Sequence, residues 1–412
     1  MGTYITPSLV AKETLIQLRN HMVFGNLVHR EFKKEFLAKT GGAVTIRKPV
    51  KFAVVKEANV TGNVNTIVEG NVTFNVDQWR SVPMSYSSTD KTLSIEDFSK
   101  RYITPAAIVL ANEVDISLAN LYQNVFNAAG TAGITPASFA ALGAAAQKLD
   151  EGAVPRDTRR LVLDPAANWS LADNLKGLFL QNRVDDMVGE GYLATLAGMK
   201  IHEDQNIARH TVGAAKDDTS TLLVCTGSDV AAVGIGGNTY VTSSAVANTS
   251  TLYVDGFNAD TAGALAAGDI FTVANDYAVN PVSKVTTGQL QQFTVVTDVT
   301  PGTNAASVTV SPAIVSSGAY QQQDSLPIDG AAITLYDSHV ANLAFHRNAF
   351  GLVFVPIELP DGAPWRARES HEGLSVMVTK DWDVLTTEET LRVDILYGVK
   401  CLYPELACRL LG

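Results

Sequence analysis

The chain has 412 residues, a formal net charge of −11 and 46% apolar residues, which is enough for more than one core because a single core stops growing at about 250–300 residues. The acidic balance argues against a protein that grips nucleic acid, since such binding requires clustered Lys and Arg. Three cysteines without a C-x-x-C pair, no secretory signal and no apolar run of about 18 residues predict a soluble, intracellular protein without a disulfide framework or a membrane span.

Four helix starts are predicted from a capping residue followed by proline. They are Thr6-Pro7, Thr104-Pro105, Thr135-Pro136 and Asp164-Pro165. The first helix should open a charged, extended N-terminal arm that reaches Phe36. The second should be a spine helix that runs to about Gly130, roughly 39 Å long at 1.5 Å per residue. Its apolar stripe at helical spacing consists of Leu110, Val114, Leu118, Leu121 and Val125.

Between the first two helices, residues 41–85 predict a long two-stranded hairpin. Val44–Val55 and Val72–Val76 are rich in β-branched residues, and Asn and Gly separate them. An isolated hairpin is marginal in water, so this one should pack on a neighbour. Its charged residues could pair across subunits and fix their register. These residues are Arg47, Lys48, Lys51, Lys56, Glu57, Glu69, Asp77 and Arg80.

The third helix should end at Gly152, and a strand at Arg160–Leu163 should lead into the fourth helix as part of an α/β domain. The composition then changes abruptly. No arginine occurs between Arg209 and Arg347, and residues 217–332 lack Trp, Met and His. We therefore predict an inserted all-β domain, an antiparallel barrel or sandwich. Its expected strands are Leu222–Cys225, Leu252–Val254, Ile270–Val273, Phe293–Val296 and Val308–Val310.

After the insert, Ala332–Tyr336 and Gly351–Pro356 are predicted to return to the host domain. The tail should finish with a β-hairpin that pairs Leu374–Val378 with Leu391–Tyr397, because apolar residues alternate in both segments.

No residue pattern predicts catalysis, a cofactor or a metal. Gly234–Gly237 is glycine-rich but lacks the Lys-Ser/Thr of a phosphate loop. His202-Glu203-Asp204 and His210 miss the spacing of a helical zinc site, so we interpret them as solvated loop residues. No G-x-S-x-G elbow is present, and Cys225, Cys401 and Cys408 are expected to be inert core thiols.

The order of these parts resembles the major capsid proteins of tailed bacteriophages, which share the Hong Kong ninety-seven fold. Within them, the chain resembles the P-twenty-two type coat proteins, which carry an inserted β-barrel. The segments that carry the resemblance are Ala266–Val273, Gly288–Val295, Leu374–Asp381, Arg392–Gly398 and Tyr403–Leu406. The resemblance implies an α+β fold with an N-arm, an extended loop, a peripheral domain with a spine helix, an axial domain and the insert.

The resemblance also implies domain boundaries. These are 1–40 for the N-arm, 41–85 for the extended loop, 86–135 and 366–412 for the peripheral domain, 136–215 and 333–365 for the axial domain, and 216–332 for the insert. In the insert, Gly234–Ser250 would hold the loop that reaches an adjacent capsomer, with Gly236, Asn238 and Tyr240 as contact residues. This segment has no charge between Asp229 and Asp255, so a salt-bridge role is weak.

The function implied by the resemblance is self-assembly into pentamers and hexamers of an icosahedral shell. The implied partners are other copies of the chain, a scaffolding protein and a portal, with double-stranded DNA enclosed without sequence-specific binding and no membrane. The protein would be made in the bacterial host cytoplasm and reside in the virion.

Two other functions remain open at this point. The insert could be a carbohydrate-binding or adhesin-type module, although such sites present aromatic platforms and the insert has no Trp. A hydrolase without a recognised motif would require a pocket with two convergent carboxylates.

Overall fold

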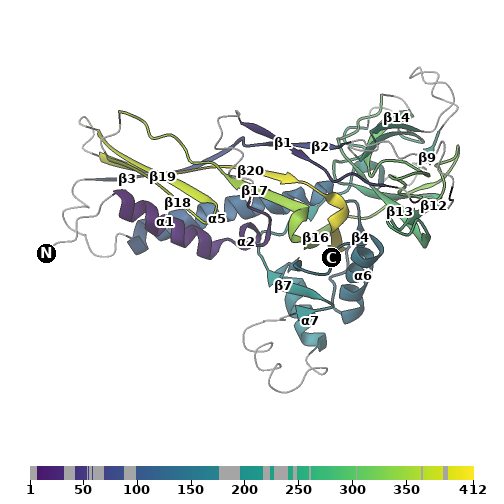
Figure 1. Ribbon diagram of the computed structural model, residues 1–412, viewed down its shortest axis with the longest axis horizontal. Coiled ribbons are helices and arrows are strands. Elements are labelled where there is room, and N and C mark those ends of the chain that lie inside the picture. Colours follow the sequence, from purple (N-terminus) through teal and green to yellow (C-terminus); the bar gives the residue numbers. More distant parts are fainter. Residues whose placement is uncertain are drawn as a thin grey trace. The chain divides into compact units, whose positions relative to one another are not determined.

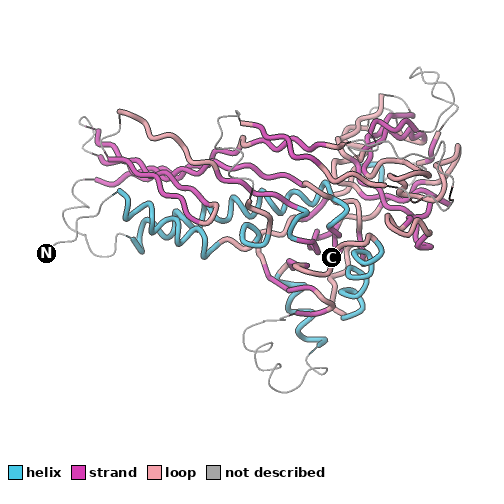
Figure 2. Tube along the Cα trace, viewed as in Figure 1, coloured by secondary structure: helices cyan, strands magenta, loops and turns pink. Residues whose placement is uncertain are grey.

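The computed structural model describes residues 7–31, 42–52, 54, 58, 69–87, 99–175, 195–216, 223–226, 240–244, 248–258, 261–302, 304–362, 365–383 and 388–412. The fold is mixed α+β and rich in strands (Figure 2). The chain divides into two compact units. Unit 1 consists of Met1–Thr45, Thr73–Ala119 and Phe350–Leu402, and unit 2 of Ile46–Val72, Asn120–Ala349 and Tyr403–Gly412.

Unit 1 is built on a five-stranded sheet in the order β17-β20-β19-β18, with β3 also paired to β20. The strands are β3 (Gln78–Ser87), β17 (Phe350–Phe354), β18 (Trp365–His371), β19 (Leu374–Asp383) and β20 (Glu388–Cys401). The predicted tail hairpin is confirmed, since β19 and β20 pair antiparallel with Val378 opposite Val393. The alternating valines and leucines of both strands are buried, which is why this pattern forms a sheet with one packed face.

Two helices cover one face of this sheet, α1 (Pro7–His21) and α5 (Thr104–Ala119). In Figure 1 they run beside the strands, and α1 contacts β18 and β19 while α5 contacts β3 and β20. The inward residues of α1, such as Leu15 and Leu18, are buried. The prediction of an extended N-terminal arm is therefore wrong for residues 7–31, because the apolar face of α1 is buried in unit 1.

The spine helix is shorter than predicted. α5 has 16 residues, about 24 Å at 1.5 Å per residue. A π-helical turn, η1 (Ser99–Ile103), precedes it, and a 3-10 helix, η2 (Asn120–Asn124), follows it. Leu110, Val114 and Leu118 are buried in α5 as predicted, whereas Leu121 and Val125 lie beyond its end. Asn120 and Asn124 disfavour continuation, since asparagine competes for backbone hydrogen bonds in non-helical conformations.

The helical run Arg101–Asn124 has the length and mean hydropathy, 1.2, of a membrane-spanning helix, but half of it is buried inside the protein. α5 packs against α1 and β20. We therefore assign this run to the protein core.

A two-stranded sheet forms at the base of the predicted hairpin, from β1 (Ala43–Arg47) and β2 (Asn71–Asn75). The Lys48 N–H donates to the Gly70 carbonyl at 2.7 Å and closes the pairing at its far end. The predicted hairpin is wrong for residues 78–85. These residues belong to β3, and all ten residues of β3 pair with β20.

Unit 2 contains two seven-stranded sheets. The first has the order β4-β21-β16-β5-β7-β6, with β8 paired to β16. Its strands are β4 (Ala128–Ala129), β5 (Arg159–Leu163), β6 (Thr195–Leu196), β7 (Met199–Glu203), β8 (Arg209–His210), β16 (His339–His346) and β21 (Ala407–Leu411). Residues 407–411 thus leave the predicted peripheral domain. The reason is that every residue of β21 is buried, which requires a central strand.

Helices α6 (Phe139–Glu151) and α7 (Pro165–Leu175) share a core with this sheet. α7 starts at Pro165 as predicted, and the Asp164 carboxylate accepts the Ala166 N–H at 3.1 Å. α6 ends at Gly152 as predicted, but it starts after Ser138 instead of Thr135. The Ser138 hydroxyl accepts the Ala141 N–H at 3.3 Å and so provides the cap.

The second sheet has the order β10-β11-β14-β13-β12-β15, with β9 paired to β11, and every pairing is antiparallel. We call it the β9–β15 sheet. Its strands are β9 (Val224–Cys225), β10 (Tyr240–Ser244), β11 (Thr249–Asp255), β12 (Ile270–Val279), β13 (Thr286–Val295), β14 (Ala305–Ser311) and β15 (Ile333–Leu335). The strands expected between residues 222 and 310 are confirmed.

One of the two predicted returns to the host domain is wrong, because Ile333–Leu335 pairs with β12 in the β9–β15 sheet. Phe350–Phe354 lies outside that sheet, as predicted, and pairs with β20 in unit 1. The first segment completes the apolar cluster around Phe271 and Phe293 through Leu335. The chain re-enters the first sheet of unit 2 at β16.

Candidate functional site: a buried polar network

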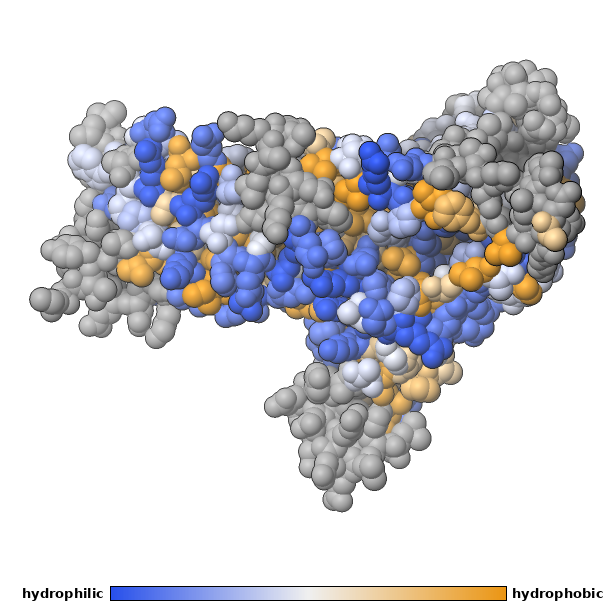
Figure 3. Space-filling model, in the orientation of Figure 1, coloured by the Kyte–Doolittle hydropathy of each residue, from blue (hydrophilic) through white to orange (hydrophobic). Residues whose placement is uncertain are grey.

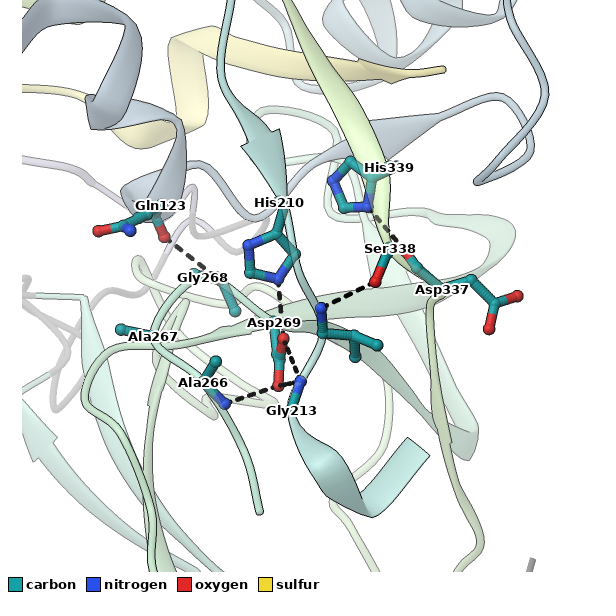
Figure 4. A network of polar contacts seen from close by, with 12 residues as sticks. Gln123, His210, Gly213, Ala266, Ala267, Gly268, Asp269, Asp337, Ser338 and His339 are labelled. Carbon is teal, nitrogen blue, oxygen red and sulfur yellow. Dashed lines mark hydrogen bonds and ion pairs between the residues drawn. The ribbon is translucent and has the colours of Figure 1, made fainter. Parts of the chain in front are cut away.

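Asp269, directly before β12, is the centre of a network of buried polar side chains in unit 2 (Figure 4). The carboxylate is fully buried. It accepts hydrogen bonds from the Gly213 N–H at 3.1 Å, the Ala266 N–H at 2.8 Å and the His210 Nε2 at 2.8 Å. These donors replace the hydration that the carboxylate loses on burial.

The His210 ring contacts Asp269 through one of its nitrogens and Tyr122 through the other. The second ring nitrogen of His210, Nδ1, lies within hydrogen-bond distance of the Tyr122 hydroxyl, at 3.1 Å. The His339 ring lies 5.2 Å from that of His210, and its Nδ1 donates to the Asp337 carbonyl at 2.8 Å. Burial lowers the pKa of His339 to about 4. His339 is therefore neutral at physiological pH and adds no second cation beside Arg409.

Arg409 of β21 supplies the cation of the network. Its side chain is fully buried and donates to the Gly268 carbonyl at 2.7 Å, the Gln123 carbonyl at 3.3 Å and the Thr294 hydroxyl at 3.2 Å. The guanidinium lies 5.1 Å from the Tyr122 ring centroid, where the ring face stabilises a cation. Burial lowers the pKa of Arg409 to about 9, so it remains charged at neutral pH.

A second buried side chain, Gln292 of β13, binds the edge strand β4. Its Oε1 accepts the Ala128 N–H at 2.7 Å, and its Nε2 donates to the Ala128 carbonyl at 2.9 Å. The side-chain amide of Gln292 thus makes the two hydrogen bonds to the Ala128 backbone that a neighbouring strand would make. Together with Arg409, it fixes the β9–β15 sheet to the first sheet of unit 2.

This arrangement is suited to holding parts of the fold together. Both carboxylate oxygens of Asp269 accept hydrogen bonds from donors within the protein. Among the described residues, no cluster of His, Cys, Asp or Glu could hold a metal ion. Cys225, Cys401 and Cys408 are buried thiols that form no disulfide, as predicted.

The prediction that His202, Glu203, Asp204 and His210 are solvated loop residues is wrong: His202 and Glu203 belong to β7, and Asp204 and His210 are buried. His210 is 3% exposed and Asp204 is 4% exposed. Asp269, Gln292 and Arg409 were not predicted as a site. The available signal was the placement of single polar residues in apolar strands, such as Arg409 between Cys408 and Leu410.

The charged residues predicted for the extended loop pair within the chain where the structure describes them. Arg47 contacts Glu69 at 3.1 Å, Lys51 contacts Glu405 at 3.7 Å, and Arg80 contacts Glu113 at 3.0 Å. Arg47 is 80% exposed, so its ion pair contributes little to stability. Of the remaining predicted residues, Lys48 donates its backbone N–H to the Gly70 carbonyl. The Asp77 carboxylate accepts a hydrogen bond from the Gln78 side-chain amide. Lys56 and Glu57 lie outside the described residues.

Most of the predicted contact loop of the insert lies outside the described residues. Gly236 and Asn238 lie outside them, and Tyr240 is described only as the first backbone position of β10. Its role in contacts stays a prediction.

A cavity of about 330 Å³ lies beside Lys51 and Glu405. Its lining contains Lys48, Lys51 and Tyr403, and Glu405 is the single carboxylate among the described residues that line it. A hydrolase pocket would require two. The cavity therefore gives no support to the hydrolase hypothesis.

Several large apolar side chains are exposed in unit 2. On the face shown in Figure 3, apolar residues are interspersed with polar ones over the described surface. The most exposed of these side chains are Val54, Ile134, Val282, Val285 and Ile328, each more than 60% exposed. Tyr253, one tyrosine that a sugar-binding platform could have used, is buried. The five most exposed of these side chains are aliphatic, which suits contact with protein better than stacking on sugars.

Comparisons with known proteins give one family. The sequence model of the family described as "P22 coat protein - gene protein 5" matches residues 5–412. Among solved structures, one from Mycobacterium phage Che8 is 14% identical with a TM-score of 0.48, covering 94% of this chain and 90% of that chain. The "Capsid structure of the Cyanophage P-SCSP1u" is 12% identical with a TM-score of 0.47, covering 94% and 87%. The "CUS-3 coat protein I-domain" is 25% identical with a TM-score of 0.18, covering 29% of this chain and 98% of that chain. The comparison with curated proteins found no match.

Proposed function

Since the chain belongs to the P22 coat protein family and is a major capsid protein of a virion, we propose that its copies assemble as pentamers and hexamers of an icosahedral shell. The shell would enclose the double-stranded DNA of a tailed phage. The observation that carries the proposal is the family match over residues 5–412. The net charge of −11 is consistent with enclosing DNA without gripping it.

We also propose that the fold is of the Hong Kong ninety-seven type with the β9–β15 sheet as an inserted domain. The support is where the chain leaves and re-enters the first sheet of unit 2. β8 ends at His210 and β16 begins at His339, and these two residues are paired with each other. The residues between them can thus form a separate sheet without separating its host strands. On this proposal unit 1 provides the peripheral domain, and unit 2 contains the axial domain and the insert.

The partners follow from the same proposal. Assembly would use a scaffolding protein and a portal, in the cytoplasm of the bacterial host. No catalytic step is part of it. The loop between β1 and β2 and the segment Gly234–Ser250 would contact neighbouring subunits.

Sucrose-gradient sedimentation and cryo-electron microscopy of the purified protein, with and without a scaffolding protein, test the proposal. Closed particles of megadalton mass with fivefold and sixfold clusters of subunits are the expected result. A protein that remains monomeric at high concentration under both conditions would contradict it.

Reversing the charge of Arg47 is expected to reduce the yield of particles while leaving the monomer intact. Arg47 is 80% exposed, so Arg47→Glu should change the free energy of unfolding by no more than about 0.5 kcal/mol. Urea unfolding and gradient sedimentation measure the two effects separately. Arg156→Glu is the matched control, because Arg156 is 81% exposed and also forms a single ion pair with a carboxylate. Equal particle yields for Arg47→Glu and the wild type would remove this loop from the proposed contacts.

A further inference from the structure

Asp276 lies at an irregularity of β12 inside the β9–β15 sheet. The pairing of β12 with β13 shifts register between Thr272 and Tyr277, and Asn275 adopts a φ of 64°. This bulge turns Asp276 inward, where it is 1% exposed. Both carboxyl oxygens are buried, and no donor among the described residues reaches either of them. A buried carboxylate without donors is costly, so the neutral form is favoured at this position.

The chain segment after β14 crosses β12 at the same place. The Asp324 N–H donates to the Tyr277 carbonyl at 3.0 Å, and the Val279 N–H donates to the Gln322 carbonyl at 3.0 Å. Gln323 between them is fully buried, and neither of its amide atoms has a partner among the described residues. The crossing thus pairs the backbone of residues 322–324 with the part of β12 that directly follows Asp276, and it brings an amide without a described partner to the same strand.

The titratable groups around Asp276 are all acids. Asp324 acts on it through its charge, and its Oδ1 already accepts the Tyr277 N–H at 3.0 Å. Burial, followed by the charges of Asp276 and Asp329, raises the pKa of the Cys225 thiol in β9. Lys284 is the single Lys or Arg of the sequence between Lys216 and Arg347. Its ammonium donates to the Ala319 carbonyl at 3.0 Å and the Gln321 carbonyl at 3.4 Å. Within the described part of the chain, no cation pairs with the Asp276 carboxyl.

We propose that Asp276 makes the β9–β15 sheet pH-sensitive: with a neutral carboxyl the crossing of residues 321–324 over β12 is closed, and ionisation of the carboxyl opens it locally. Opening would bring water to the carboxylate and to the Gln323 amide. The device acts in the single chain and does not require assembly.

The direction of the pH effect follows from the two states. Burial, followed by the charge of Asp324, raises the pKa of Asp276 from 3.8 to about 8. When the crossing is open, the carboxyl ionises near its ordinary value, and when it is closed the proton is retained up to about pH 8. The closed state therefore binds more protons between these values, and its stability falls as pH rises through that window. One proton corresponds to about a tenfold change in the opening equilibrium for each pH unit.

Hydrogen–deuterium exchange of the full chain, measured between pH 5 and 9 and corrected for intrinsic exchange, tests the proposal. In the wild type, protection of peptides from β12 and residues 321–324 should fall by about tenfold per pH unit up to about pH 8 and then level off. Asp276→Asn should abolish this slope, because the amide cannot ionise. At pH 8 it should be at least about tenfold better protected than the wild type.

Asp298→Asn is the matched control. The Asp298 carboxylate is in the same sheet region but accepts the Ala267 N–H at 2.7 Å in an exposed setting, so the slope should remain. Peptides from β19 and β20 should show no such slope in any variant. A flat profile in the wild type, or an unchanged slope in Asp276→Asn, overturns the proposal. If Asp276→Asn does not fold, the wild-type profile alone decides by the same criterion.

Discussion

Arg409→Ala is expected to destabilise unit 2 by about 3–5 kcal/mol, the effect of removing one partner from a buried charged network. The substitution leaves the Gly268 and Gln123 carbonyls without the donors that they have in the wild type. It also leaves the fully buried Asp269 without the nearby positive charge. Far-UV circular dichroism during urea unfolding measures the loss, and exchange in β13 and β21 localises it.

A double-mutant cycle separates the charge effect from the loss of packing. Arg409→Met keeps much of the side-chain volume, and Asp269→Asn removes the negative charge while it retains an acceptor oxygen. The double variant should be less destabilised than the sum of the two single variants by about 1–2 kcal/mol, because no uncompensated charge remains. Additive effects, or a loss below about 1 kcal/mol for Arg409→Ala, would show that the network does not hold the two sheets of unit 2 together.

Local signals in the sequence predict much of this fold. Asp164-Pro165 marks the start of α7, and the alternation of valines predicts the hairpin of β19 and β20. The short runs of β-branched residues predict the strands of the β9–β15 sheet. These predictions succeed because each of them depends on only a few neighbouring residues.

Where tertiary packing decides, the same signals fail. The apolar stripe through Leu121 and Val125 predicts a longer helix, but the chain turns at Asn120 and Tyr122 joins the buried network. Residues 407–411 follow the tail hairpin in sequence, yet they pair with β16 and β4, because a fully buried strand needs neighbours on both sides.

The buried network is the part least visible in the sequence. Asp269 and Arg409 are 140 positions apart (409 − 269) and carry no motif. Their relation depends on the placement of β21 beside β4, which brings Arg409 to Gly268. A lone arginine in an apolar strand predicts a buried partner, but it does not identify that partner.

Gly398→Ala is expected to destabilise unit 1 by about 3 kcal/mol, within the upper range for overpacking a core. A Cβ at this position of β20 would lie 2.2 Å from the Asn75 carbonyl oxygen and 3.1 Å from the Val76 Cα. Both are backbone atoms, so a change of side-chain rotamer cannot relieve the clash. The loop between β2 and β3 would have to move away from the sheet.

Tryptophan fluorescence during urea unfolding suits this measurement, because Trp79, Trp365 and Trp382 all belong to unit 1. Gly362→Ala is the matched control in the same unit, since a Cβ there meets no atom within 4 Å. It should change the free energy of unfolding by no more than about 0.5 kcal/mol. If Gly398→Ala unfolded at the same urea concentration as Gly362→Ala, the close passage of Asn75 over β20 would not exist in solution, and the base of the β1–β2 loop would be free to move independently of the sheet.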